Sequence, residues 1–474
     1  MEQKSPLNTA PGELYGDHLR ELQTSIAENL SNHEFDAVVF ASGQPVPHHR
    51  DDNAPAFRGN ADFMRVVGGL DAERDEKTAA VGARLGYTAG HFVVLDLESE
   101  KPTLFVNSDP KSPWYMPPAI SEGAGQHFNL NVGTPNEIRS ALRAFLDGKK
   151  VAGVGRKSDF QGVSGIKNDP VDFLKVLDRN SLAKTPFEIA ALRLANVNTA
   201  RGHEAALDSF MNGGTQGEVL MAFSAGAKQR EAYQSYPPIV GIGKHAAVLH
   251  HEGGDFDFNL GDHLLLDAGM THLGYPADVT STFLRHDANP VFREVVKGLD
   301  IIQRDIVKML TVDSNFNEMQ RAMHIRIGEL LIQVGILRNC SAEEAAVAGY
   351  TKVFCPHSIG HSLGARVHDR GMLELGKNGK PIMMTDKNQP DSILNGTVVR
   401  RPFVENQVMT VEPGIYFIKG LLDKHRSDAE HFDWKLIDML EGGARIETNV
   451  WVTRQALSGN VDLTRLALPK GTNA

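Results

Sequence analysis

The sequence predicts two domains, an α/β domain over residues 1–175 followed by an α+β domain over residues 176–474. The chain of 474 residues is too long for one ordinary domain. Up to about residue 170, apolar strand-like segments alternate with amphipathic helical ones. Beyond that point, strand-like and helical segments come in separate blocks, and this is the pattern of an α+β domain.

The composition is that of a globular protein, with 41% hydrophobic and 23% charged residues. A formal net charge of −10 argues against nucleic acid or an anionic membrane as partner, because both bind basic surfaces. The N-terminus lacks the apolar core of a signal peptide, and no apolar stretch has the length of a membrane span. The two cysteines are too few for a disulfide framework. We therefore expect a cytoplasmic protein without a membrane segment.

The first domain is expected to begin with a helix from Leu14 to about Asn32. Apolar side chains recur along it at helical spacing, namely Leu19, Leu22, Ile26 and Leu30. Buried strands are expected at residues 36–41, 91–95, 103–106 and 151–155, and a second helix at 138–146. A proline-rich aromatic loop around Trp114 suggests an interface or a lid.

The second domain is expected to open with a long helix. Thr185 is a suitable N-cap, Pro186 takes the first helical position, and Glu188 follows the cap by three residues as in a capping box. This helix should reach Phe210, and another should begin near Gln216. The remainder is predicted to be β-rich to residue 284, helical over 291–334 and β-rich again over 398–452.

Two aspartates stand in apolar, strand-like sequence of this second domain. Asp267 follows three leucines, and Asp278 leads into a second β-type run, so both lie near a pair of short buried strands joined by a Gly-containing turn. A buried carboxylate is normally paired, protonated or bound to a cation, because burying it alone is costly. Taken by themselves, the two are equally well interpreted as turn or cap residues.

Further candidate ligands follow downstream. Three histidines lie within twelve positions among glycines and small residues, namely His357, His361 and His368. They do not form the zincin motif, because Ser358 stands where that motif requires a glutamate. Glu412 ends an apolar strand at a Pro-Gly turn, and Glu447 lies inside another β-type segment.

Oxygen ligands dominate this set of two aspartates, two glutamates and His361. Such a set suits hard or borderline divalent ions such as manganese better than a thiolate-type zinc site. Four carboxylates cannot neutralise one another, whereas two divalent cations can. Two metals that share carboxylates can deprotonate a water and hydrolyse an amide at neutral pH.

In chain order, the motifs Asp-Ala-Gly, Tyr-x-x-Asp-x-Thr, His-Ser-Ile-Gly-His, Val-Glu-Pro-Gly-Ile-Tyr and Arg-Ile-Glu-x-Asn resemble those of the pita-bread metallopeptidases. This family includes methionine aminopeptidase, aminopeptidase P and prolidase. The resemblance is closest to bacterial prolidases (Xaa-Pro dipeptidases) and their organophosphorus-hydrolysing relatives. Two segments carry it: Tyr236-Pro237-Pro238, and the long insertion between Glu412 and Glu447.

The resemblance implies a creatinase-like N-terminal domain on a pita-bread (creatinase/aminopeptidase) catalytic domain. It implies hydrolysis of Xaa-Pro dipeptides through a hydroxide that bridges two divalent metals. The implied ions are two Mn²⁺ per subunit, with Co²⁺ or Zn²⁺ as substitutes. The expected partners are the small peptide substrate and a second copy of the chain, in a homodimer.

The resemblance also implies a role for each candidate ligand. Asp267 would bind the second metal, and Asp278 and Glu447 would bridge the two ions. His361 and Glu412 would complete the first site, and Glu412 would also shuttle the proton of the hydroxide.

Other positions would contact the substrate. His250 and His368 would stabilise the tetrahedral intermediate and are, with Glu412, the expected catalytic residues. The remaining substrate-binding candidates are His357, Arg445, Arg400, Tyr236 and Trp114. In the prolidase dimer, the aromatic that Trp114 resembles reaches a neighbouring subunit's site.

One departure from the family concerns the substrate. Prolidases carry an arginine fourteen positions before the strand glutamate, where it grips the dipeptide's carboxylate, and here that position is Val398. Arg400 can replace it through a local shift; without a replacement, dipeptide affinity should fall, because a bidentate Arg–carboxylate pair is hard to replace.

Several alternatives stay open. One is a related dinuclear hydrolase with a shifted substrate: an aminopeptidase P-like peptide, another amide or an organophosphate ester. A non-catalytic pita-bread binding module is a further alternative. A nucleotide-binding interpretation of residues 241–244 is weak, because the segment lacks a third glycine and a following helix.

Overall fold

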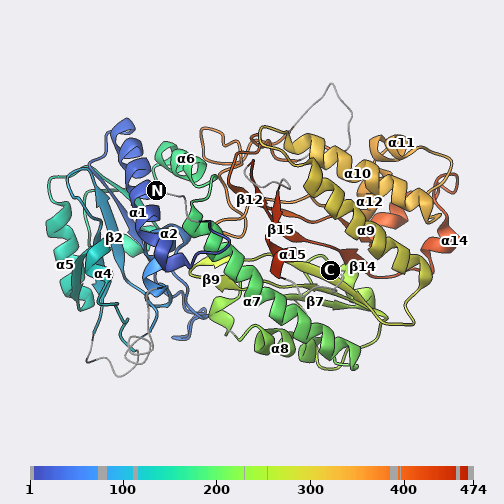
Figure 1. Ribbon diagram of the computed structural model, residues 1–474, viewed down its shortest axis with the longest axis horizontal. Helices are drawn as coiled ribbons and strands as arrows, with labels where there is room; N and C mark the ends of the chain where they lie inside the picture. The colour runs from blue at the N-terminus through green and yellow to red at the C-terminus, as the bar shows by residue number, and fades with distance from the viewer. Residues whose placement is uncertain are drawn as a thin grey trace.

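The computed structural model describes residues 5–72, 83–109, 111, 116–228, 230–252, 255–384, 393–394, 397–454 and 460–467. The chain forms a smaller N-terminal lobe, blue to teal in Figure 1, beside a larger lobe that contains the remaining elements. Trp114 lies outside the described residues.

The N-terminal lobe is built on one six-stranded sheet with the order β4-β3-β2-β1-β5-β6. The central strands β1, β2 and β3 pair antiparallel, and the outer pairs are parallel. The strands are β1 (Ala37–Ala41), β2 (Phe92–Asp96), β3 (Thr103–Asn107), β4 (Asn129–Gly133), β5 (Val151–Val154) and β6 (Ile166–Asn168). The α/β prediction is confirmed. Strands β4 and β6 were not anticipated, because β4 is largely exposed, β6 has only three residues, and neither contains an apolar run.

Helices cover this sheet. The longest, α1, is the predicted N-terminal helix, and its buried leucines pack in the core of the lobe. Among the described residues, the α-helices of the lobe are α1 (Pro11–Asn32), α2 (Ala61–Val67), α4 (Ala124–His127), α5 (Pro135–Leu146) and α6 (Val171–Asn180). The predicted division between residues 175 and 176 falls inside α6, and we propose that the domains divide in the link at 181–185 that follows it.

Helix α7 (Pro186–Met211) begins at the predicted capping box. The Thr185 side chain accepts from the Glu188 N–H, and the Glu188 carboxylate accepts from the Thr185 N–H at 2.9 Å. The next helix, α8 (Gln216–Gly226), begins with the same arrangement at Thr215 and Glu218.

The two strands predicted around the aspartates do form, but the connection between them is longer than a simple turn. Strands β8 (His263–Asp267) and β11 (Thr280–Leu284) pair antiparallel, and a two-residue ladder of β9 (Thr271–His272) and β10 (Tyr275–Pro276) lies between them. Strand β7 (Ile239–Ile242) pairs with the other edge of β8. Gly269 is required in the connection, because a Cβ there would lie 1.9 Å from the Ala277 carbonyl oxygen.

The segment 291–334, predicted as helical, consists of α9 (Pro290–Met309) and α10 (Phe316–Gln333). The break is caused by Asp313, which has a positive φ of 72°, and by Asn315, which caps α10. The short helices α11 (Ala342–Val347) and α12 (Tyr350–Phe354) follow.

The predicted β-rich region 398–452 also contains short helices. Its strands are β12 (Gln407–Val411), β13 (Gly414–Tyr416), β14 (Gly443–Arg445) and β15 (Thr448–Val452), followed by β16 (Val461–Asp462). The helices are α13 (Lys419–Leu422) and α14 (Trp434–Ile437), with α15 (Leu463–Ala467) near the end of the chain.

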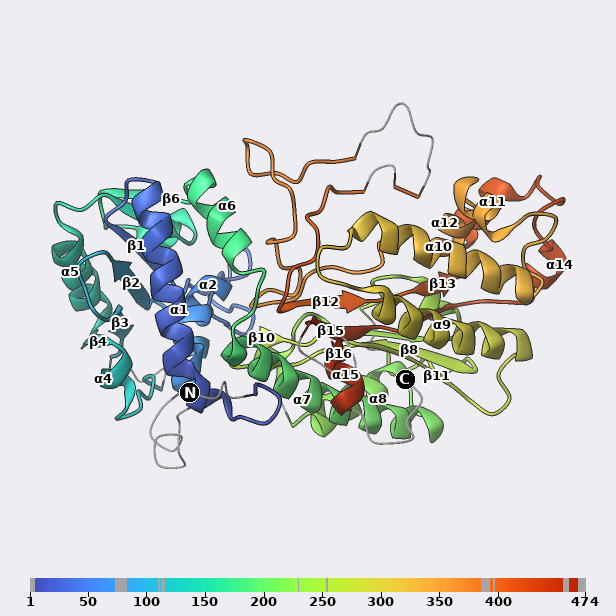
Figure 2. The same ribbon diagram turned by 45° about the horizontal axis from the view of Figure 1, so that its top comes forward.

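Two pairs of helices enclose the strands of the larger lobe. Helices α7 and α8 pack against β7 and β8, while α9 and α10 share a core with β12, β13, β14 and β15. Figure 2 shows the pairs on opposite sides of the strands. The two lobes also share apolar packing, because one hydrophobic cluster joins α1 residues to Phe187 and Tyr275. Among the described residues, no helix is both long and apolar enough to span a bilayer.

Candidate metal centre

Strand pairing brings three of the predicted ligands to one place. Asp267 at the end of β8 pairs with Thr280 at the start of β11, two residues after Asp278. The Glu447 N–H donates to the Thr280 carbonyl at 3.0 Å, so Glu447 lies beside the same strand end. Asn449 holds Asp278 from the other side, because its side chain accepts from the Asp278 N–H at 3.1 Å.

The other two ligands come from the end of β12 and from a loop beside it: Glu412 directly follows the strand, and His361 belongs to the loop. The Glu412 N–H donates to the Ile359 carbonyl, and the Thr410 N–H donates to the His361 carbonyl, both at 2.9 Å. Glycine is required at 360 because a Cβ would lie 2.1 Å from the Thr410 carbonyl oxygen. This close approach places His361 next to Glu412.

The five side chains converge in space. His361 Nε2 lies 3.2 Å from Asp278 Oδ2 and 3.9 Å from Glu412 Oε1. One ligand atom each of Asp278, His361 and Glu447 lies within 4.8 Å of the other two. The Glu447 and Asp278 side chains are 3% and 8% exposed, and Glu412 is the most exposed carboxylate at 17%.

Neighbouring groups hold the carboxylates in orientation. Tyr236 donates its hydroxyl to Asp267 Oδ1 at 2.5 Å, and Thr280 donates to Glu447 Oε2 at 2.7 Å. Arg445 donates to Asp267 Oδ2 and lies 3.9 Å from Glu447. Such outer contacts fix the geometry of ligand oxygens before a cation binds.

Arg445 also starts a hydrogen-bond chain toward His357. Its Nη1 donates to the Tyr416 hydroxyl at 2.7 Å, and that hydroxyl lies 3.0 Å from His357 Nε2. His357 Nδ1 lies 2.8 Å from the Ser358 carbonyl and must donate to it, so Nε2 accepts from Tyr416. Burial and the charge of Arg445 lower the pKa of His357 to about 4, which keeps this acceptor neutral.

The cluster carries more negative charge than its protein neighbours neutralise. Burial and the charges of Asp278, Glu412 and Asp267 hold the pKa of Glu447 well above its ordinary value. Burial likewise raises the pKa of Glu412 to about 7, although His361 and Arg445 oppose it. Buried carboxylates with this charge excess, and with oxygen as the dominant donor, fit divalent cations.

His361 is oriented as a ligand. Its Nδ1 lies 3.2 Å from the Ser362 carbonyl and donates to it, which directs Nε2 at the carboxylates. Burial disfavours the imidazolium, but the hydrogen bond and charge of Asp278, together with Glu412, raise the pKa of His361 to about 9. Positive charge is therefore favoured at the point where a cation would lie.

A cavity of about 460 Å³ opens onto this cluster. His250, His368 and Tyr236 line it, as do His357 and Arg445. His250 and His368 are exposed, and the His368 ring centroid lies 4.3 Å from that of His361. The structure thus brings together all the described candidates for catalysis and substrate binding except Arg400.

Arg400 lies outside this cavity lining. Its guanidinium lies over the Phe316 ring at 3.9 Å, and its Nη2 donates to the Ser358 hydroxyl at 3.4 Å. Val398 lines a separate, smaller cavity that also contains His357 and Ser358. Arg400 therefore contacts the neighbour of His357 without lining the catalytic cavity.

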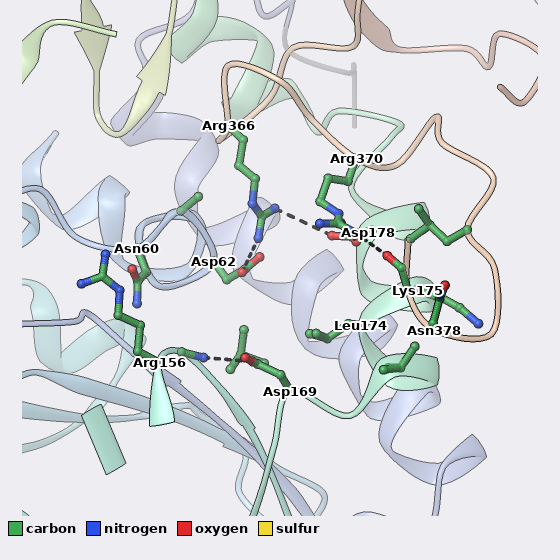
Figure 3. Close-up of a pocket in the computed structure, with 16 residues that line it drawn as sticks. Asn60, Asp62, Arg156, Asp169, Leu174, Lys175, Asp178, Arg366, Arg370 and Asn378 are labelled. Carbon is green, nitrogen blue, oxygen red and sulfur yellow. Dashed lines mark hydrogen bonds and ion pairs between the residues drawn. The ribbon is translucent and has the colours of Figure 1, made fainter. Parts of the chain in front are cut away.

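A larger cavity of about 510 Å³ lies where the two lobes meet. Figure 3 shows Arg366 between Asp62 of α2 and Asp178 of α6, and Arg370 also faces Asp178. Arg366 and Arg370 balance the charges of these aspartates, so the cavity lacks the concentrated negative charge of the ligand cluster. The loop that carries Arg366 also carries His368, and it therefore separates the two cavities.

Sequence reasoning assigned no role to three residues that support the ligands. Thr280 holds Glu447, Tyr416 links Arg445 to His357, and Thr410 donates to Glu412 Oε1 at 3.3 Å. Each lies two to four residues from a predicted ligand on the same motif. Alternation along a strand, which places residues i and i+2 on one face, could have identified Thr280 and Thr410.

Comparison with protein families gives two matches. Residues 190–454 match metallopeptidase family M24, and residues 13–74 match the family described as Xaa-Pro dipeptidase, N-terminal domain. The first match includes all five predicted ligands.

Curated relatives and solved structures match along nearly the whole chain. An Xaa-Pro dipeptidase of Marinobacter nauticus is 30% identical over 94% of this chain and 96% of its own length. Xaa-Pro dipeptidase 1 of Idiomarina loihiensis is 31% identical over 95% of both chains. Among solved structures, aminopeptidase PepP of Pseudomonas aeruginosa has a TM-score of 0.72 at 21% identity, covering 96% of each chain. Zn-substituted aminopeptidase P of E. coli, in complex with product, has a TM-score of 0.69 at 19% identity over the same shares.

Proposed function

Because the chain belongs to metallopeptidase family M24 and has the two-domain pita-bread fold, we propose that it is a prolidase, a dipeptidase that hydrolyses Xaa-Pro dipeptides. The observation that carries the proposal is the convergence of Asp278, His361 and Glu447 within 4.8 Å. The near full-length likeness to proteins named Xaa-Pro dipeptidase supports the choice of substrate.

Five residues would hold two divalent cations in this proposal: Asp267, Asp278, His361, Glu412 and Glu447. The family resemblance implies that Asp278, 3.2 Å from His361, and Glu447, held by Thr280, would be shared between the ions. Bound cations would polarise the scissile carbonyl and lower the pKa of the attacking water.

The protein's own groups would carry the proton and bind the peptide. Glu412 has the most exposed of the four carboxylates and faces the cavity, so it is suited to move a proton between water and the leaving amine. His250 and His368 lie on the cavity lining, where they would contact the peptide and stabilise the developing oxyanion. Tyr236 donates to Asp267, so its part in substrate binding would be through the apolar face of its ring.

The carboxylate of a dipeptide needs a cation at the closed end of the site. Arg400 is the candidate, because it contacts Ser358, the neighbour of the cavity-lining His357. It would have to turn away from Phe316 to reach the substrate.

An aminopeptidase P-like preference for longer peptides is the second candidate. Val398 favours it, because the arginine that resembles the dipeptide clamp is missing at that position. An organophosphate ester remains a further substrate class for the same centre.

We further propose manganese as the metal, since oxygen donors dominate the ligand set. A cytoplasmic location is supported by the free thiols of Cys340 and Cys355. A homodimer in which Trp114 reaches the partner's site follows from the family resemblance, and sedimentation of the intact chain tests it.

The proposal is tested by assaying the Mn²⁺-reconstituted enzyme on Gly-Pro, Leu-Pro, a tripeptide with proline second, and paraoxon. We expect cleavage of the dipeptides. Asp278→Asn should lower this activity by at least about 10²-fold, because the loss of a group that only supports a metal ligand already costs about 10–100-fold. Cleavage of the tripeptide alone would reject the dipeptidase in favour of the second candidate. Unchanged activity in Asp278→Asn or His361→Ala would reject the metal centre itself.

A further inference from the structure

A second group of metal-ligating side chains lies outside the catalytic cluster. His245, His251 and Asp255 each offer a ligand atom, and these atoms all lie within 4.8 Å of one another. They belong to the segment between β7 and β8, which shares no ligand with the carboxylate cluster. Within the described part of the chain, no hydrogen bond or ion pair joins the three to one another.

The neighbours of His245 fix which of its nitrogens is free. The Gln216 side-chain oxygen accepts from the Ile242 N–H at 3.1 Å, which identifies that atom as the oxygen. The same oxygen lies 3.0 Å from His245 Nδ1, so Nδ1 must carry the proton and donate. His245 Nε2 consequently keeps its lone pair, as metal-ligating histidines do when a second group holds the other nitrogen.

The other two side chains complete a usable donor set. His251 Nε2 is buried and has no hydrogen-bond partner among the described residues, which is an unfavourable state for a polar atom. Its ring centroid lies 4.5 Å from that of His245. Asp255 is exposed and can move toward both imidazoles, and Gln216 Nε2 lies 3.5 Å from its Oδ2.

The surroundings also favour the neutral imidazole that a metal requires. Burial and the charge of the neighbouring Lys244 lower the pKa of His245. The ring is held by stacking on Phe258, with centroids 3.9 Å apart. His245 is thus positioned by Gln216 on one edge and by an aromatic ring on one face.

We propose that His245, His251 and Asp255 form a second metal site, which binds a borderline divalent cation such as Zn²⁺ with water as the fourth ligand. Two imidazoles and one carboxylate suit zinc, whereas the oxygen-rich catalytic cluster suits manganese. Ligand atoms around tetrahedral zinc lie about 3.4 Å apart for bonds of about 2.1 Å, so a small movement of Asp255 closes the site. A bound ion would fix the segment that carries His250 and Glu252, both of which line the catalytic cavity.

The test isolates this site in the full-length chain. A variant with Asp278→Asn and Glu447→Gln removes both bridging catalytic ligands, and equilibrium dialysis with Zn²⁺ is followed by metal analysis. One Zn²⁺ per chain is expected to remain bound. Adding Asp255→Asn or His251→Ala should weaken this binding by at least about tenfold, because even outer-shell changes cost about 10–100-fold. Asp257→Asn, an exposed acid two residues away, is the matched control and should have no effect.

Two results would overturn the proposal. One is the absence of a bound Zn²⁺ in the catalytic double variant. The other is binding that Asp255→Asn and His251→Ala leave unchanged. Asp255 is exposed, so its variant should fold normally, and circular dichroism checks this. As a second measurement, the wild-type chain dialysed against excess Zn²⁺ should bind three ions, two in the catalytic centre and one at this site; a total that never exceeds two ions would contradict the site.

Discussion

Among single residues, Arg445 has the widest influence on the metal centre. Its guanidinium contacts Asp267, Tyr416 and Thr280, and it lies 3.9 Å from Glu447. It is almost fully buried, so these contacts are little screened by water. Arg445 therefore supplies positive charge to the cluster and also orients His357 through the Tyr416 hydroxyl.

Arg400 and Arg401 are neighbours with different expected roles. Arg401 pairs with Glu374 at 2.9 Å, whereas Arg400 contacts Ser358 and forms no ion pair with a carboxylate of the described residues. Arg400→Ala should raise KM for Gly-Pro by about 10–100-fold with a smaller change in kcat, because a charge-assisted hydrogen bond contributes about 1.5–3 kcal/mol. Steady-state kinetics measures this, with Arg401→Ala as the control. Equal KM values for Arg400→Ala and wild type would show that another group holds the carboxylate.

His91 provides a pH-dependent contribution to stability away from the metal centre. Its Nδ1 accepts from the Asn107 N–H at 3.0 Å, so Nε2 donates to the Thr88 hydroxyl at 2.7 Å. A proton on Nδ1 would face the Asn107 N–H, and burial lowers the pKa of His91 to about 3.

In the unfolded state, His91 therefore binds a proton below pH 6.5, whereas in the folded state it does so only near pH 3. The free energy of unfolding should fall by about 1.4 kcal/mol per pH unit as pH drops through this window. Urea titrations from pH 7 to pH 5 measure the slope. His91→Asn keeps an acceptor near the position of Nδ1 and should reduce the slope by about 1.4 kcal/mol per pH unit, the contribution of one proton. An unchanged slope would show that His91 does not cause the pH dependence.

At the scale of elements, two helices begin with the same capping box in different surroundings. The box at Thr215 is exposed, whereas Thr185 is buried and its hydroxyl also lies 2.7 Å from His18 Nδ1. Thr215→Ala should cost about 1 kcal/mol, the usual value for a lost cap. Thr185→Ala should cost more, about 2 kcal/mol, because it also leaves a buried partner unsatisfied. Urea midpoints compare the two, and equal losses would mean that the His18 contact contributes nothing.

The elements that sequence predicted best have strong local signals. The start of α7 follows from Thr185, Pro186 and Glu188, and β8 follows from three consecutive leucines. The break between α9 and α10 was missed because the apolar period continues across it, although Asn315 is a typical N-cap. The exposed strand β4 was missed because its neighbour β3 specifies it, rather than its own side chains.

The candidate site was predictable in part for a similar reason. The five predicted ligands belong to recognisable motifs, so the sequence predicts that they lie close together. They are Asp267, Asp278, His361, Glu412 and Glu447. The position of Arg400 beside Ser358 depends on how its guanidinium packs on the Phe316 ring, and no local pattern specifies that contact. The group at His245, His251 and Asp255 depends on Gln216 of a separate helix, and this contact too is tertiary.

At the scale of the whole molecule, the two lobes are joined by a common core. Phe187 at the start of α7 is fully buried and packs against Tyr15 of α1 and Tyr275 of β10, with centroids 5.3 and 6.0 Å apart. Beside it, Arg65 of α2 forms a buried ion pair with Glu188 at 2.9 Å. Burial of this kind couples the stability of one lobe to that of the other.

Leu142→Ala tests this coupling from the far side of the N-terminal sheet. Leu142 is fully buried on α5, and its loss should cost about 2–5 kcal/mol. In a Trp114→Phe background, the remaining tryptophans, Trp434 and Trp451, both belong to the catalytic lobe, and Trp434 lies outside the cluster shared with the N-terminal lobe. Their urea transition should move to lower concentration together with the circular dichroism signal. A tryptophan transition that Leu142→Ala leaves in place would mean that the lobes unfold independently.

The core around Phe187 also limits how such a protein can be recombined. A chimera joined at residues 175 and 176 would cut α6 and bring a foreign N-terminal lobe against Phe187, Glu188 and Tyr275. Its new partners would have to match the volume of Tyr15 and the charge of Arg65 at once. A chimera of two relatives should therefore fold only when α1, α2 and the first turn of α7 all come from the same parent protein.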